Sequence, residues 1–141
     1  MAGVSVTERI AASADRVWGV IGDFGGLVRW LPAIAACTVE GHGIGAVRTL
    51  GFVGADVFAR ERLDAHDDAA RSYTYTVVGT DLPIAAYNAT MTVAPDGDAA
   101  SLLHWSSSFT VTADGDENEV ATMIERTYRD GIANVRTILG V

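Results

Sequence analysis

Two residues of opposite charge have the types and the spacing for acid–base chemistry. Residues 45–52 and 56–63 alternate in polarity on either side of Gly54-Ala55, which is typical of a β-hairpin. If Gly54-Ala55 is a two-residue turn, the resulting register places Arg48 directly opposite Glu61. We therefore predict that an arginine and a glutamate face each other on neighbouring strands.

The same alternation predicts which way these side chains point. Because every second residue of a strand points to the same face, Arg48 lies on one face with Leu50 and Phe52. Glu61 lies on a face whose other residues are apolar, namely Val57, Ala59, Leu63 and Ala65. The opposite face of that strand carries Arg60, Arg62 and Asp64. Both members of the pair are thus expected on an apolar wall.

An inward Arg48–Glu61 pair has two interpretations. A buried ion pair rarely stabilises a fold more than an apolar pair of the same volume, so it indicates either a structural salt bridge or a role on a ligand. In the second case, a carboxyl group on an apolar wall can serve as a general acid or base. The aromatic residues on the following strands favour the second interpretation, in which the pair acts on a ligand.

Those aromatic residues are expected to form a pocket with a few polar groups. The inward parity of the later strands carries Tyr73, Tyr75, Tyr87, Trp105 and Phe109. We assign five more residues to the same pocket, namely Phe52, Leu82, Pro83, Trp30 and Tyr128. Each aromatic side chain taken alone is better explained by core packing than by ligand contact, and this applies to Trp30 in particular.

Other kinds of chemistry have little support in this sequence. All ten basic residues are arginines, which excludes Schiff-base catalysis by a lysine. The single cysteine, Cys37, is interpreted as core packing, and no cluster has the spacing of a metal site, so we predict neither metal nor cofactor. The three histidines, His42, His66 and His104, fall in turns or at strand positions that point outward, and they are assigned to the surface. Ser106–Ser108 lacks a histidine on its own face, so a hydrolase triad is not supported.

Composition limits the class of protein and its partners. A chain of 141 residues with 49% apolar and 20% charged residues is typical of one folded domain, residues 1–141. The net charge of −8, with no clustered basic patch, argues against nucleic acid. No apolar run is long enough for a membrane span, and residues 1–10 do not resemble a secretory signal. We expect a cytoplasmic monomer or homodimer that binds a small apolar molecule.

The elements that position the pair can be read along the chain. Residues 4–10 alternate as a strand, and Ser13 and Asp15 are typical of the start of a short helix. A break at Asp23–Gly26 precedes one or two further helical turns, which Pro32 ends. Turn signals then divide residues 34–111 into a six-stranded antiparallel meander. Finally, Asp116 or Asn118 caps a long helix with an apolar stripe, namely Val120, Ile124, Thr127, Gly131, Val135 and Ile138.

These elements predict an α+β fold in which a curved seven-stranded antiparallel sheet grips the C-terminal helix, with two short helices after the first strand. The order and spacing of the sequence pieces resemble the SRPBCC or START-like helix-grip superfamily, and within it the polyketide cyclase/dehydrase-like branch. The resemblance covers nearly the whole chain. It rests on Ala14–Trp18, Asp23-Phe24, Trp30–Pro32, Gly45–Arg48, Glu61–Leu63, Leu82-Pro83, Trp105 and the final helix.

The branch is also similar to the onion lachrymatory-factor synthases and the plant abscisic-acid receptors. Similarity to the synthases implies acid–base work by Glu61, with Arg48 holding a polar or anionic group and with Tyr75 and Tyr87 beyond them. Residues 79–83 resemble the gate loop that closes over ligand in the receptors. The receptors bind a carboxylate with a cavity lysine, and this chain has no lysine, which argues against hormone sensing.

Two classes of function stay open on this evidence, because one fold can host both. The first is a cyclase, dehydratase, isomerase or lyase that uses Glu61 and Arg48 on a bound apolar or aromatic molecule. The second is a non-catalytic carrier or sensor. An interaction domain without a ligand is a third possibility, but it would have no need of the inward pair.

Overall fold

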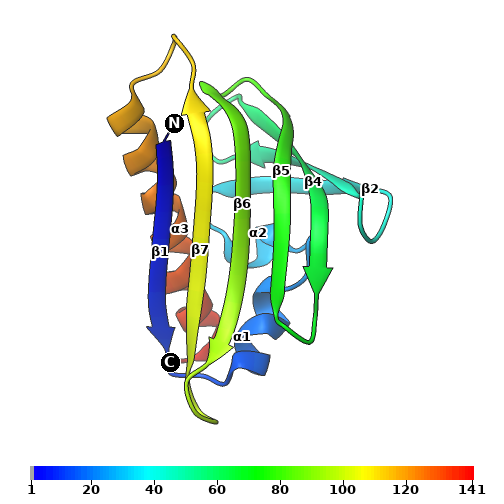
Figure 1. Cartoon of the computed structure of the whole chain (residues 1–141), viewed down its shortest axis with the longest axis vertical. Coiled ribbons are helices and arrows are strands. Elements are labelled where there is room, and N and C mark those ends of the chain that lie inside the picture. Colours follow the sequence, from blue (N-terminus) through cyan, green and yellow to red (C-terminus); the bar gives the residue numbers. More distant parts are fainter. Residues whose placement is uncertain (1) are drawn as a thin grey trace.

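The computed structural model describes residues 2–141, and in it a curved antiparallel sheet wraps around one long helix (Figure 1). In chain order the elements are β1 (Ala2–Ile10), α1 (Ala14–Ile21), α2 (Leu27–Trp30), β2 (Ile34–Glu40), β3 (Val47–Phe52), β4 (Phe58–Asp67), β5 (Ser72–Thr80), β6 (Ile84–Pro95), β7 (Ser101–Val111) and α3 (Glu117–Leu139). The seven strands of the described residues are ordered β1-β7-β6-β5-β4-β3-β2. The predicted helix-grip architecture, with its meander from β2 to β7, is confirmed.

Helix α3 begins at a cap that the sequence indicates. The Asp116 side chain accepts a hydrogen bond from the Glu119 amide, and Gly140 ends the helix with a left-handed conformation at φ +73°. The buried stripe consists of Val120, Ile124, Tyr128, Gly131, Ile132 and Val135. Tyr128 and Ile132 therefore face the sheet, whereas the predicted stripe residues Thr127 and Ile138 are only partly buried or exposed.

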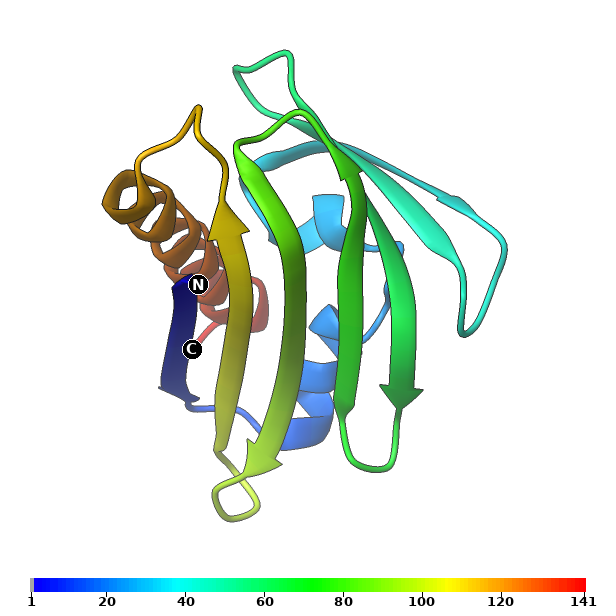
Figure 2. The same ribbon diagram turned by 45° about the horizontal axis from the view of Figure 1, so that its top comes forward.

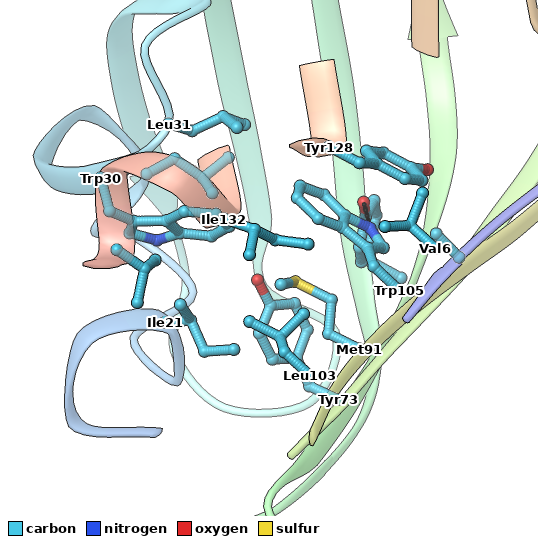
Figure 3. Close-up of a cluster of buried hydrophobic side chains, with 14 of the residues drawn as sticks. Val6, Ile21, Trp30, Leu31, Tyr73, Met91, Leu103, Trp105, Tyr128 and Ile132 are labelled. Carbon is cyan, nitrogen blue, oxygen red and sulfur yellow. Dashed lines mark hydrogen bonds between the residues drawn. The ribbon is translucent and has the colours of Figure 1, made fainter. Parts of the chain in front are cut away.

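Two short helices lie against the concave face, α1 at one end and α2 nearer the middle of the sheet (Figure 2). Helix α1 is capped by Ser13, whose side chain accepts from the Arg16 amide, and α2 ends just before Pro32. Helix α3 passes close to α2 at Gly131, where a Cβ atom would lie only 2.6 Å from Leu31 Cδ1. The resulting core joins α1, α2, α3 and the sheet through Ile21, Trp30, Tyr73, Leu103 and Ile132 (Figure 3).

The β3–β4 hairpin has the predicted register but a different turn. Arg48 is paired with Glu61, as the polarity pattern predicted. The pairing ends at Gly51 with Phe58, so the connection is a longer loop that includes residues 53–57 and not a two-residue turn. The register is retained because the apolar face of each strand must meet the core.

The predicted strand faces are wrong near the end of β4, where the pairing with β5 is irregular. The pairing of β4 with β5 shifts between Leu63 and Ala65, which inverts the alternation after Leu63. Ala65 is consequently exposed instead of inward, and His66 turns toward the core. The His66 ring stacks on Tyr73, and its Nε2 lies 3.0 Å from the Gly22 carbonyl oxygen. The prediction that His66 is a surface residue was therefore wrong.

Within residues 2–141, no helix has the length and apolarity to cross a membrane.

Candidate functional site

A cavity of about 90 Å³ lies between the sheet and the first half of α3. Most of its wall is apolar and comes from α2, the strands β2 to β6 and α3, namely Leu27, Leu31, Ile34, Leu50, Phe52, Ala59, Val77, Leu82, Ile84, Met123 and Ile124. Met123 also lies at the surface, with 46% of its area exposed. The cavity therefore reaches solvent beside Met123 on α3.

The polar part of the wall includes the Arg48–Glu61 ion pair. Arg48 Nε donates to Glu61 Oε1 at 2.8 Å, and Arg48 Nη1 donates to the Phe24 carbonyl oxygen at 2.8 Å. The residues are only 1% and 7% exposed, respectively. Among residues 2–141, Glu61 Oε2 and Arg48 Nη2 make no further hydrogen bond. Each partner thus retains one group that can contact a molecule in the cavity.

Aromatic rings surround the Arg48 guanidinium. Its central carbon lies 4.2 Å from the ring centre of Phe24, 4.7 Å from that of Tyr75 and 5.7 Å from that of Tyr73. Burial alone would lower the Arg48 pKa, but the Glu61 carboxylate and the nearby tyrosines outweigh burial and raise the pKa above its ordinary value. Arg48 is therefore a permanent cation whose charge is balanced by Glu61.

Three tyrosines and one tryptophan form a second polar group of the wall. Trp105 Nε1 donates to the Tyr75 hydroxyl at 3.1 Å, and the hydroxyls of Tyr87 and Tyr128 are hydrogen-bonded to each other. The Trp105 and Tyr128 rings are stacked, with centroids 3.8 Å apart (Figure 3). Burial raises the pKa of Tyr75 and Tyr87 well above the ordinary value, and burial likewise raises that of Tyr128. All three phenols are therefore protonated hydrogen-bond donors.

The cavity wall includes eight of the residues that the sequence suggested for a site, namely Arg48, Glu61, Phe52, Tyr75, Leu82, Tyr87, Trp105 and Tyr128. Four suggested residues lie behind it or beside it. Tyr73 packs under Trp18, Phe24 and His66. Phe109 lies against Tyr87, and Trp30 lies against Trp105. The Pro83 ring packs against Gly115, away from the wall. These four support the site without facing the cavity.

Several lining residues were not identified as site residues from the sequence. Val77 continues the inward parity of Tyr73 and Tyr75, so strand alternation could have included it. Thr127 and Ile124 were recognised only as parts of the helix stripe. Met123 gave no signal, because an exposed methionine on a helix is ordinary and only the tertiary arrangement brings it to the opening.

The described side chains include no cluster of three or more histidine, cysteine, aspartate or glutamate residues that could hold a metal ion. Cys37 is a partly buried free thiol on β2, and burial raises its pKa. The cavity wall can therefore contact a bound molecule through hydrogen bonds, aromatic rings and one ion pair.

Comparisons with known proteins place this architecture among related chains. A solved structure of the protein XoxI from Bacillus cereus is 29% identical and superposes with a TM-score of 0.89, covering 98% of this chain and 95% of that one. A protein from Thermobifida fusca is 32% identical with a TM-score of 0.74, over 93% of this chain and 85% of that one.

A more distant structure shares the fold. Norcoclaurine synthase from Thalictrum flavum, solved with dopamine and hydroxybenzaldehyde, is 21% identical with a TM-score of 0.71, over 99% of this chain and 87% of that one. The sequence has no significant match among curated proteins. The family described as polyketide cyclase / dehydrase and lipid transport matches residues 1–140. The chain is therefore a member of the polyketide cyclase / dehydrase and lipid transport family.

Proposed function

We propose that this protein binds a small apolar or aromatic molecule in its cavity and catalyses acid–base chemistry on it, of the cyclase, dehydratase, isomerase or lyase type. Glu61 is the acid–base group, and Arg48 holds a polar group of the substrate. The observation that carries this proposal is the nearly complete burial of a charged pair in the wall of an otherwise apolar cavity. Such a pair is costly to bury and gives little stability in return.

The geometry suggests how the two residues divide the work. Glu61 Oε2 is the free carboxylate oxygen, so it can take a proton from a bound molecule and return it to another atom of that molecule. Arg48 Nη2 is available to donate to a substrate oxygen where negative charge develops. Because the two charges cancel, the site favours a neutral substrate. The surrounding apolar wall keeps bulk water away from the transferred proton.

The size of the site limits the substrate. An apolar cavity of about 150 Å³ holds a molecule such as benzene, so a cavity of about 90 Å³ limits the bound molecule to no more than one ring. Norcoclaurine synthase, which shares the fold, was solved with two single-ring compounds. A single-ring aldehyde or ketone is therefore a suitable starting probe for this protein.

The proposal is tested by proton exchange, which does not require the natural substrate to be known. A panel of single-ring ketones is incubated in D2O with the protein, and NMR follows the replacement of hydrogen next to the carbonyl group. We expect the wild-type protein to accelerate exchange of at least one ketone, and Glu61→Gln to reduce that acceleration about 100-fold. Glutamine has the shape of glutamate but cannot take the proton.

Two measurements on the same samples give this experiment its controls. Glu40→Gln, at an exposed position on β2, should leave exchange unchanged. Thermal unfolding and probe affinity of Glu61→Gln separate lost chemistry from lost structure. Full exchange activity in a folded Glu61→Gln variant would exclude Glu61 as the acid–base group.

A carrier or sensor is the second candidate function, and one observation favours it. Arg48 already has two hydrogen-bond partners within the protein and lies beneath three rings, as expected of a structural ion pair. In that case the probes bind, no ketone exchanges faster with protein than without it, and Glu61→Gln chiefly lowers stability.

A further inference from the structure

Ala59 on β4 is a small side chain in a wall of large ones. It is only 3% exposed and lines the cavity, and every other residue that the described strands contribute to the wall is valine or larger. Ala59 is also absent from the packed apolar core that contains Leu63 and Leu50, its neighbour on β3. The burial of Ala59 therefore comes with empty space beside it and not with close packing.

The backbone at Ala59 is fixed on both sides. The Phe58 amide donates to Asp81 Oδ1 at 2.9 Å, and the Phe58 carbonyl oxygen accepts from Thr80 Oγ1 at 2.7 Å. Two residues further along β4, Glu61 is held by its ion pair. Because β4 cannot move away from the cavity at this point without breaking these contacts, the size of the Ala59 side chain sets how much space remains.

Ala59 is also well placed relative to the ion pair. Ala59 and Glu61 lie on the same buried face of β4, and Arg60 between them is exposed. Two residues of a strand span about 7 Å, which is close to the length of a benzene ring with its hydrogens. Ala59 is therefore at the right distance to contact the ring of a molecule whose carbonyl group reaches Glu61 and Arg48.

We propose that Ala59 is the specificity-determining residue of the cavity. It keeps open the space for the ring of the bound molecule, whose polar group contacts Arg48 and Glu61. This inference rests on the proposed function, because it assumes that the cavity holds a small molecule. It adds to that function a fixed orientation of the ligand and an upper limit on its size beside β4. A flat ring with a short polar substituent satisfies both conditions.

Acetophenone and cyclopropyl methyl ketone are suitable probes, because both are methyl ketones and the ring of the second is much smaller. Dissociation constants for both are measured by NMR titration with wild-type protein, Ala59→Val and Ala59→Leu. We expect Ala59→Leu to weaken acetophenone about tenfold more than cyclopropyl methyl ketone, because the added isopropyl group overlaps the larger ring. Ala59→Val adds a smaller group and should have an intermediate effect. Ala94→Leu, at an exposed position on β6, is the control and should leave the ratio of the two affinities unchanged.

A matched pair of substitutions separates reserved space from ordinary packing. Ala89 on β6 is 1% exposed, but it belongs to the packed core and does not line the cavity. Ala89→Leu should lower the midpoint of urea unfolding, because a larger side chain has no room there. Ala59→Leu should keep or raise the midpoint, because its added carbon atoms fill empty apolar space.

Nuclear Overhauser effects locate the ring of the probe directly. In wild-type protein saturated with acetophenone, the Ala59 methyl group should be close to the ring protons of the probe and not to its acetyl protons. This measurement needs no substitution, so it tests the orientation of the ligand even if a variant fails to fold.

Three results would overturn the inference. One is an equal loss of both ketones in folded Ala59→Leu protein, and another is a destabilisation of Ala59→Leu as large as that of Ala89→Leu. The third is contact of the Ala59 methyl group with the acetyl protons of acetophenone instead of its ring. If wild-type protein binds neither ketone, the ligand cavity of the proposed function fails together with this inference. Selective binding without proton exchange supports the inference and contradicts only the catalytic proposal.

Discussion

The two ends of the concave sheet face differ in what covers them, although the same strands form both. Toward one end, α1, α2 and the following turn fill the space, and Tyr73 is packed by Trp18, Phe24 and His66. Toward the other end the first half of α3, with Leu27 and Leu31 at α2, covers the sheet, and the cavity remains between them and the strands. Tyr75, two residues along the same face of β5, lines that cavity.

The difference shows that the cavity is set by coverage and not by the inward residues themselves. Both ends carry large aromatic side chains, and both contain a buried tyrosine hydroxyl. The Tyr73 hydroxyl is buried without any partner, whereas the Tyr75 hydroxyl accepts from Trp105. Arg48 lies between the two ends and contacts both rings. The following predictions test how far the ends differ.

The largest effect is expected from breaking the ion pair between the two ends. Arg48→Met should lower the free energy of unfolding by about 3–5 kcal/mol, because Glu61 would be left buried without a counter-charge. The double variant Arg48→Met with Glu61→Leu should recover most of that loss. Urea denaturation of the three proteins measures this. A single variant as stable as the wild type would show that water reaches Glu61 freely.

The next prediction concerns alkaline pH, where both ends should respond together. All four tyrosines have raised pKa values in the folded state, chiefly because burial disfavours the phenolate. In the unfolded chain they lose protons near pH 10, so the unfolded state binds fewer protons than the folded state above that pH. Stability should therefore fall above pH 10 by about 1.4 kcal/mol per pH unit for each such tyrosine.

Tyrosinate absorbance near 295 nm and far-ultraviolet circular dichroism should accordingly change in one joint transition. The two ends would differ if one tyrosine ionised at a pH below the unfolding transition. The absorbance change of that tyrosine should then be absent from Tyr75→Phe and still present in Tyr73→Phe. That result would place solvent in the cavity and sharpen the contrast between the two ends. If that absorbance change were instead absent from Tyr73→Phe, Tyr73 would be accessible to solvent, which would contradict its packing by Trp18, Phe24 and His66.

A smaller effect is expected from removing one hydroxyl at each end. Tyr75→Phe leaves the buried Trp105 N–H without an acceptor and should cost about 1–3 kcal/mol. Tyr73→Phe removes a hydroxyl that has no hydrogen-bond partner, so it should be neutral or slightly stabilising. Thermal and urea unfolding of this matched pair measure the difference. Equal losses in both variants would contradict the hydrogen-bond assignment at Tyr75.

The sequence was sufficient to predict the fold and the position of the charged pair. The turn expected at Gly54-Ala55 is longer than two residues, but the strand pairs are centred between these two residues, so Arg48 lies opposite Glu61 as predicted. A register slip of one residue would have exposed the apolar face. The alternation failed after Leu63, where the pairing of β4 with β5 shifts and turns His66 inward. No residue near that point carries a signal for such an irregularity.

The boundary of the cavity was harder to predict than its chemistry. Parity shows that Tyr73, Phe109 and Tyr75 all point inward, but it does not show which of them another layer covers. That depends on where α1 and α2 lie against the sheet and on how α3 crosses it. These are tertiary contacts between segments far apart in sequence, and local patterns do not encode them.

The smallest effect is expected at the cavity opening, in the loop of residues 81–83. Leu82 lines the cavity, and its amide donates to Thr80 Oγ1 while its carbonyl accepts from the Ile84 amide. A molecule in the cavity should pack against Leu82 and slow amide exchange at Leu82 and Ile84 a few-fold, since opening of the loop would break that contact. NMR-detected hydrogen exchange with and without saturating acetophenone measures this. The Val93 amide, which bonds to the Arg71 carbonyl at the packed end, is the internal reference and should not change. Leu82→Ala should abolish the slowing without preventing binding. Equal slowing at Val93 would indicate global stabilisation by the ligand, and no slowing at Leu82 would show that this loop is not a gate.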